Sequence, residues 1–273
     1  NTTVTATGLS ADTRYDAYVR ANCGGGNGQS SYIGPVSFTT PCAAITAPLT
    51  ENFDGANFDA GTNTIDSCWA RGDDGAGYEW KVDNNGTPSP NTGPNDDVSG
   101  GGNYLFTEAS SGGTGAEAFL SSPPIDLSSL TEPRMIISYH LFGSNMGTFR
   151  VEVKEASNAN YTTEFTISGQ QQTADSDPFV KEVIDLSAYA GQTVDIRFVG
   201  ERGSGITSDI AIDEFVVEET PDDLSVDIGY VQGRLRDGQP YNVQAVVSNQ
   251  GNSVTNRDVF LEVRGANTHD DQL

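Results

Sequence analysis

Residues 208–217 constrain the fold more than any other stretch, because they read as one long β-strand with a break in its pattern. Side chains of a strand alternate between its two faces. Large apolar side chains occupy even positions up to Ile212 and odd positions from Phe215 onward, so the alternation slips at Asp213 and Glu214. Such a slip indicates a β-bulge, which can redirect a carboxylate. We therefore expect an all-β fold in which Asp213 serves something other than packing.

A second alternating stretch precedes this strand. Val194, Ile196 and Phe198 alternate with other side chains, and residues 200–205, which begin and end with glycine, follow them. Two alternating runs separated by a short glycine-containing loop are typical of a β-hairpin. The sequence predicts that the two stretches pair as a hairpin that closes a β-sandwich.

The sequence as a whole has an all-β composition and a strongly acidic charge. It contains 31 glycines, and no stretch has a sustained helical period. With 38 acidic and 14 basic residues among 273, the net charge of -24 argues against nucleic acid, which needs clustered basic side chains. Acidic side chains suit either divalent cations or solubility in salt. No run of about 18 apolar residues is present, so we expect no membrane insertion.

Several motifs occur in the order found in a MAM domain, an extracellular jelly-roll module. Residues 191–214 resemble the end of such a domain, and residues 50–54 (Thr-Glu-Asn-Phe-Asp) resemble its opening. Residues 92–110 carry the Gly-Pro, the aspartate and the glycine-then-tyrosine strand of the family. The resemblance covers residues 43–219 and is nearest to the bacterial version in exported proteins of the Bacteroidota. It implies a MAM-like jelly-roll β-sandwich for these residues.

Both flanks resemble parts of other extracellular β-modules. Residues 1–42 resemble the C-terminal part of a fibronectin type III domain without its early strands. Residues 220–273 resemble the N-terminal part of a CARDB-type immunoglobulin-like domain. About 40 residues cannot bury a core of their own. The resemblance therefore implies partial immunoglobulin-like sandwiches at both ends, as if the sequence were cut from a row of tandem modules.

The MAM resemblance also implies a structural calcium site. The family often holds a cation between its opening strand, a Gly-Pro-x-x-Asp loop and its last strand. The residues of this sequence at those places are Asn52, Asp54, Asp96, Asp97 and Asp213. Asp96 is able to substitute for Asp97. Calcium takes about 6–8 oxygen ligands from carboxylates, backbone carbonyls and water. The alternative is that each of these side chains caps a turn.

The three cysteines allow one disulfide and leave one cysteine over. Cys23 and Cys42 lie at opposite ends of two predicted strands, roughly 30 Å apart at about 3.3 Å per residue, whereas bonded cysteines have Cα atoms about 6 Å apart. The resemblance implies a bond between Cys42 and Cys68, where the family usually has its first disulfide. Cys23 would then pair upstream in the intact protein. The alternative is a cytosolic protein with three reduced cysteines.

The sequence carries no familiar catalytic motif. Its two histidines are His140 and His269, and it contains no His-Glu-x-x-His, Gly-x-Ser-x-Gly or Cys-x-x-Cys pattern. His140 lies in an apolar strand, where a structural role is the ordinary one. Paired carboxylates are frequent, but their separation across a cleft, which glycosidase chemistry requires, cannot be read from sequence. We expect this chain not to be an enzyme.

These expectations describe a non-catalytic adhesion or recognition region of a large exported multidomain bacterial protein, extracellular or at the cell surface. Its partners would be a protein or glycan at the cell surface, together with neighbouring modules of the same long chain. One alternative is an accessory region of a secreted peptidase or polysaccharide hydrolase whose catalytic domain lies outside this chain. Another is a structural subunit of a surface filament. The sequence on either side of Asn1 and Leu273 would separate these hypotheses.

Overall fold

The computed structural model describes residues 4–22, 24 and 28–221 in full. Beyond residue 221 it describes the backbone of the strands β16 (Leu224–Ile228), β17 (Ala245–Asn249), β18 (Phe260–Val263) and β19 (His269–Gln272). Cys23 lies outside the described residues, so its upstream pairing stays a prediction. The chain divides into two compact units, residues 1–218 and residues 219–273.

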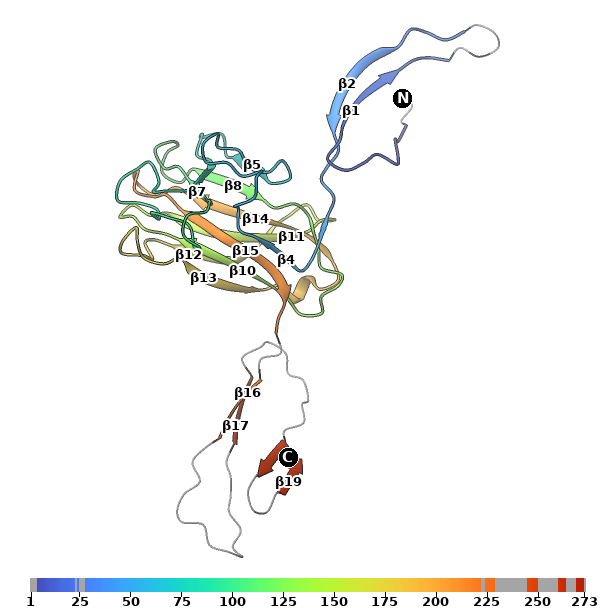
Figure 1. Cartoon of the computed structure of the whole chain (residues 1–273). Coiled ribbons are helices and arrows are strands. Elements are labelled where there is room, and N and C mark those ends of the chain that lie inside the picture. The colour runs from blue at the N-terminus through green and yellow to red at the C-terminus, as the bar shows by residue number, and fades with distance from the viewer. Residues whose placement is uncertain are drawn as a thin grey trace, which may run out of the picture. The chain divides into compact units, whose positions relative to one another are not determined.

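The residues from β3 to β15 form a β-sandwich of two sheets, which confirms the predicted all-β fold (Figure 1). The first sheet contains, in spatial order, β13 (Val180–Asp185), β10 (Pro133–His140), β15 (Ala211–Glu219), β7 (Tyr104–Thr107) and β6 (Trp80–Asp83), and β4 (Leu49–Glu51) also pairs with β15. The second sheet contains β12 (Thr162–Ser168), β11 (Thr148–Glu155), β14 (Thr193–Glu201), β8 (Glu117–Ser121) and β5 (Ala70–Asp73), with the short strands β9 (Ile125–Asp126) and β3 (Ile45–Thr46) joined to β14 through β9. Between β13 and β14 lies a single turn of 3-10 helix, η1 (Ser187–Tyr189).

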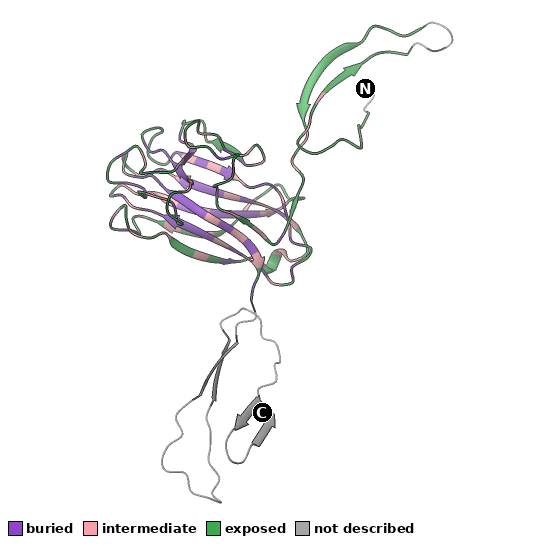
Figure 2. Cartoon of the chain, in the orientation of Figure 1, coloured by how far each residue is buried: buried purple, intermediate pink, exposed green. Residues whose placement is uncertain are grey.

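The apolar faces of the two sheets meet and form the core, where the buried residues concentrate (Figure 2). On β11, alternation places Phe149, Val151 and Val153 in this core, and all are fully buried. Phe198 of β14 contacts Phe215 of β15 edge to face, with ring centroids 5.5 Å apart. Aromatic side chains from opposite sheets therefore hold the middle of the sandwich together.

The predicted hairpin of β14 with β15 is wrong. β14 pairs with β11, β8 and β9 in the second sheet, whereas β15 pairs with β7 and β4 in the first. The intervening residues 202–210 cross from one sheet to the other. Alternation shows that a strand buries one face, but it does not show whether the next strand lies beside it or across the core. Phe198 and Phe215 meet because their strands pack face to face.

The predicted slip in β15 is present. Glu214 has a φ of 48°, in the left-handed region that few residues other than glycine adopt. β15 pairs with β7 as far as Ile212 and with β4 from Phe215 onward, and both of these side chains lie in the core. Asp213 lies on the opposite face and is only 1% exposed. The strand therefore changes partners at the slip and places a buried acid on its outer face.

A long connection covers this outer face. The connection, residues 84–103 between β6 and β7, is bonded to residues before β13, since the Asn95 amide donates to the Asp175 carbonyl at 3.0 Å. Beneath it a small apolar cluster forms outside the main core, made of Tyr104, Phe106 and Ala211 with Phe179 packed against them. The connection buries polar groups that an uncovered sheet face would leave in water, and it carries part of the candidate site.

A disulfide joins Cys42 to Cys68, with Cα atoms 5.7 Å apart. This is the pairing that the family resemblance implies. Trp69, the residue after Cys68, is 7% exposed and contacts the Phe53 ring at 5.4 Å between centroids. The bond closes a segment that contains β3, β4 and the turn after β4. It thereby ties the start of the sandwich to a residue beside its core.

The strands outside the sandwich form small antiparallel pairs. β1 (Arg14–Val19) pairs with β2 (Ile33–Thr39), β16 with β17, and β18 with β19. The β1–β2 pair exposes apolar side chains, with Ile33 80% and Val36 68% exposed. The assignments of these flanks to fibronectin type III-like and CARDB-like modules stay predictions. Within the described residues no helix has the length and apolar character that crossing a membrane requires.

Candidate cation site

Asp213 is the innermost of the predicted ligands. Its Oδ2 accepts the Val98 amide at 2.9 Å and its Oδ1 accepts the Glu214 amide at 2.7 Å. Burial, followed by the charges of Asp97 and Glu214, raises the pKa of Asp213 to about 7 despite these two amide donors. The strand slip that places Asp213 here thus creates a buried acid with a neighbouring acid and no basic partner in the described chain.

Asp97 organises the glycine-rich turn of the connection. Its Oδ2 accepts the amide and the hydroxyl of Ser99 at 2.9 and 2.6 Å, and its Oδ1 accepts the Gly102 amide at 2.8 Å. Burial acts to raise the pKa of Asp97, but the Ser99 and Gly102 donors outweigh it and hold that pKa below the ordinary value. Asp97 is therefore the ionised member of the pair with Asp213.

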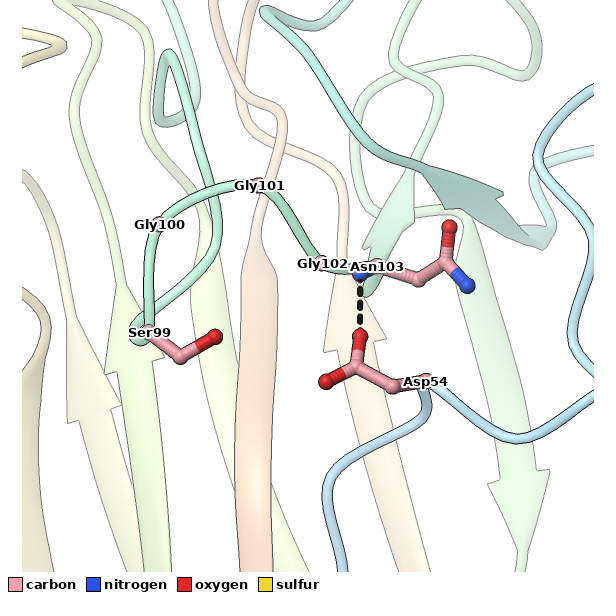
Figure 3. A pocket seen from close by; sticks show the side chains of 6 residues that line it. All are labelled: Asp54, Ser99, Gly100, Gly101, Gly102 and Asn103. Carbon is pink, nitrogen blue, oxygen red and sulfur yellow. Dashed lines mark hydrogen bonds between the residues drawn. The ribbon is translucent and has the colours of Figure 1, made fainter.

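Asp54 reaches the same turn from the segment after β4. Its Oδ1 accepts the Asn103 amide at 2.6 Å, as the dashed line in Figure 3 shows. Its Oδ2 accepts the Asn52 side-chain amide at 2.7 Å. Asn52 therefore orients Asp54, and the structure bonds it to Asp54 rather than to the buried acids.

Gly102 brings Asp54 and Asp97 together because it has no side chain. A Cβ at Gly102 would lie 2.2 Å from Asp54 Oδ1 and 2.8 Å from Asp97 Oδ2. The two carboxylates thus flank one point on the turn. Sequence reasoning named the acids but missed Gly102 and Asn103, whose signal was the Gly-Gly-Gly-Asn run that closes the turn.

Replacing Gly102 with alanine is expected to displace Asp54 and to lower the free energy of unfolding by about 1–2 kcal/mol. The new Cβ would overlap the Asp54 carboxylate and break its bond to the Asn103 amide. Chemical denaturation of both proteins measures the difference. Gly113→Ala is the matched control, since a Cβ there meets no atom within 4 Å. Equal stability of the two variants would contradict the assigned contact.

Asp96 faces a different part of the turn. Its Oδ1 accepts the Asp97 amide at 3.0 Å and the Gly101 amide at 2.9 Å. It lines a hollow of about 170 Å³ with Asp97, Asp175 and Phe179, whereas Asp54 lines a separate, more open hollow of about 280 Å³ with residues 99–103 (Figure 3). The predicted five-residue set is therefore divided between two sides of one glycine-rich turn.

The predicted acids do not by themselves form a three-carboxylate cation site in the described structure. Among the described residues, no three predicted acid ligands have oxygens all within 4.8 Å of one another, and the one group that meets this distance contains the disulfide-bonded Cys42 and Cys68. Asp54 lies beside Asp97, and Asp97 lies near enough to Asp213 to raise its pKa. Calcium accepts backbone carbonyls and water in addition to carboxylates. A calcium ion held by a pair of these acids would therefore need backbone carbonyls or water to complete its coordination.

A comparison with protein-family models finds a match that covers most of the sandwich. The model of the MAM domain (meprin/A5/mu) matches residues 56–221. The chain belongs to the MAM domain family.

Relatives of this MAM protein include neuropilins. It is 34% identical to Neuropilin-1a of Danio rerio over 101 residues, which are 35% of this chain and 11% of that protein. It is 29% identical to Neuropilin-1 of Xenopus laevis over 127 residues, 46% of this chain and 13% of that protein. The MAM chain thus spans only a small part of the length of these curated relatives.

Solved structures with a similar sandwich include an adhesin domain and a sugar-binding domain. The K1 cleaved adhesin domain of Lys-gingipain from Porphyromonas gingivalis W83 is 19% identical, with a TM-score of 0.43 over 64% of this chain and 99% of that one. The CBM22-1 xylan-binding domain of Paenibacillus barcinonensis Xyn10C is 17% identical, with a TM-score of 0.36 over 64% of this chain and 97% of that one.

Proposed function

We propose that the MAM sandwich is a non-catalytic recognition module of an exported cell-surface protein, and that a calcium ion fixes the loops at its recognition end. One observation carries this proposal: Asp54, Asp97 and Asp213 come from the opening segment, the connection and the last strand, and they converge on one glycine-rich turn. Like charges repel unless something compensates them. A cation would convert this repulsion into a bond between the three segments.

Each acid has a separate part in holding the ion. Asp213 would be the buried anchor, Asp97 the ligand that also shapes the turn, and Asp54 the ligand at the open side. When bound, calcium would supply charge compensation and coordination bonds that join the three segments, and it would take part in no reaction. The hollow of about 280 Å³ beside Asp54 is open and polar, which suits contact with a protein or glycan partner.

The described side chains favour binding over catalysis. His140 is fully buried, and burial lowers its pKa to about 4, so it is neutral and shielded from a substrate. Asp97 and Asp213 accept backbone amides on both of their carboxylate oxygens, an arrangement that shapes loops. A bacterial surface protein with fibronectin type III-like and CARDB-like modules at either side is the setting we propose for this module.

Chelation is expected to lower the melting temperature of the protein by roughly 5–10 °C, because a ligand at about a hundredfold its Kd stabilises by about 2.7 kcal/mol. The measurement is thermal unfolding with millimolar calcium against excess chelator. Asp213→Asn should melt at one temperature under both conditions. Asp73→Asn, which removes an exposed acid of β5, should keep the full calcium response. If the unmodified protein melts identically with calcium and with chelator, the acids are turn caps and the site does not exist.

A further inference from the structure

Asn85 and Gly86 form an exposed turn at the start of the connection, just after β6. In an Asn-Gly pair the main-chain nitrogen of the glycine reaches the asparagine side chain with least hindrance, because glycine carries no Cβ. The sequence contains two such pairs, and Asn85-Gly86 is the pair that the structure describes in full. The candidate cation site makes no use of either residue.

The Gly86 nitrogen is free to react. Within the described part of the chain, the Gly86 amide donates no hydrogen bond. A Cβ at Gly86 would meet nothing closer than the Asn95 Cα and the Pro94 carbonyl oxygen, each 3.9 Å away. An exposed main-chain amide without a protein partner is bonded to water, which can take up its proton. The nucleophile of the pair is therefore neither engaged nor crowded.

One distant residue holds this turn in place. The Tyr104 hydroxyl donates to the main-chain carbonyl of Asn85 at 2.5 Å. Tyr104 is the first residue of β7, immediately after the connection, and its side chain is fully buried in the small apolar cluster. This bond therefore fastens the start of the connection to the strand at its end.

The remaining contacts of the turn are local. Asp83 Oδ1 accepts the amides of Asn84 and Asn85 at 2.8 and 3.2 Å. The side-chain amide of Asn85 donates to Asn84 Oδ1 at 2.6 Å. Both interactions need a neutral, amide-bearing side chain at Asn85, since a carboxylate there could not donate to Asn84 and would add a negative charge beside Asp83.

Asn103, the last residue of the connection, has the opposite surroundings. Its side-chain amide donates to the carbonyls of Phe53 and Phe58 at 3.1 and 3.3 Å. Tyr104 follows it in the sequence, so a large side chain stands beside the nitrogen that would have to react. Asn103 is therefore an internal reference that shares the segment but lacks the open geometry.

We propose that Asn85 is a site of spontaneous modification, at which the Gly86 nitrogen displaces the side-chain amide nitrogen of Asn85. The Gly86 nitrogen bonds to Asn85 Cγ, the bond from Cγ to Nδ2 breaks, and ammonia leaves with the proton that Gly86 gave up. Water then opens the cyclic imide by adding hydroxide to one ring carbonyl carbon and returning a proton to the Gly86 nitrogen. Opening at the main-chain carbonyl gives isoaspartate, and opening at Cγ gives aspartate.

Isoaspartate at this position would release the connection from Tyr104. Its main chain runs through Cγ, so the former main-chain carbonyl of Asn85 becomes a carboxylate on a side branch. The buried Tyr104 hydroxyl then faces a charged branch and no longer holds the backbone, and bringing a charge toward the apolar cluster is unfavourable. Repulsion from Asp83 acts in the same direction.

The released segment leads directly to Asp96 and Asp97, so the modification is expected to weaken calcium binding. This consequence rests on the proposed function, whereas the modification itself does not.

The test incubates the full chain in mildly alkaline, chelated buffer and maps its peptides by mass spectrometry, with isoaspartate methyltransferase labelling as the second readout. Asn85 is expected to lose its amide nitrogen at least about tenfold faster than Asn103. Gly86→Ala places a methyl group beside the nucleophile and should slow the loss by about tenfold. Asn85→Gln keeps an amide but would have to close a larger ring, so it should stay unmodified.

Tyr104→Phe measures the structural consequence, because it removes the bond to the Asn85 carbonyl without any modification. Aged protein and fresh Tyr104→Phe should each melt about 2–4 °C below fresh protein. Aged Tyr104→Phe should melt little below fresh Tyr104→Phe, since the same bond cannot be lost twice. Aged Asn85→Gln is the control for every other change that incubation causes, and it should melt as it did when fresh.

An Asn85 amide that lasts as long as that of Asn103, or that is lost equally fast in Gly86→Ala, would overturn the modification site. Full additivity in aged Tyr104→Phe would overturn the release from Tyr104. If Asn85 is modified but neither fresh nor aged protein responds to calcium, the modification stands and the cation site fails. If fresh protein binds calcium, equally tight binding by aged protein would overturn the link between the turn and the site.

Discussion

Replacing Phe198 with alanine is expected to lower the free energy of unfolding of the sandwich by about 3–5 kcal/mol. The Phe198 side chain is fully buried in β14 and stacks on Phe149 and Trp69 with ring centroids 6.3 Å away in each case. It also contacts Phe215 across the core. Removing it deletes contacts to both sheets and leaves a cavity that the surrounding rings cannot fill.

Chemical denaturation and thermal unfolding measure this loss, which corresponds to a melting temperature about 10 °C lower. Phe38→Ala makes the same chemical change at a side chain of β2 that is 41% exposed, and it should change stability by less than about 0.5 kcal/mol. Phe198→Leu keeps most of the side-chain volume, so its loss of stability should fall between those of Phe198→Ala and Phe38→Ala. A loss below about 1 kcal/mol for Phe198→Ala would show that the two sheets do not meet at this ring.

Loss of the Cys42–Cys68 bond is expected to destabilise the protein by about 3 kcal/mol, because the bond closes a segment with a sequence separation of 26. The main effect is greater freedom of the unfolded chain. Cys42→Ser, Cys68→Ser and the double replacement should all lose the same amount, since each removes the same single bond. Peptide mapping without reduction should recover Cys42 linked to Cys68. A different pairing, or a double replacement much less stable than either single one, would contradict this account.

Much of the architecture could be predicted because alternation is a local signal. The slip at Glu214 was readable because apolar side chains change parity on either side of it. The partner of β15 was not readable, since pairing and face-to-face packing produce the same alternation. Phe198 and Phe215 show the difference: they are close in sequence and touch, yet they belong to separate sheets.

The candidate site was predictable as a set of residue types but not as a geometry. The family resemblance placed Asp54, Asp97 and Asp213 near one another, and the structure brings them to one turn. Asp96 and Asp97 are adjacent in sequence, and only the path of the turn decides which of them approaches Asp54. The buried Asp209 was missed because its bonds to Thr92 and to the Ala109 amide join it to residues far away in the sequence.

The disulfide also determines how the sandwich would respond to mechanical tension. A pull from the N-terminal side reaches Cys42 first and passes through the bond to Cys68, so the backbone between them carries none of the load. That sheltered stretch includes β4 and Asp54. β4 pairs with β15 only through a short run of residues near the C-terminal end of β15. Without the disulfide, tension would break the hydrogen bonds of such a short pairing one at a time. Under load the force therefore enters at the residue before the buried Trp69, and β4 and the segment after it that presents Asp54 carry no tension.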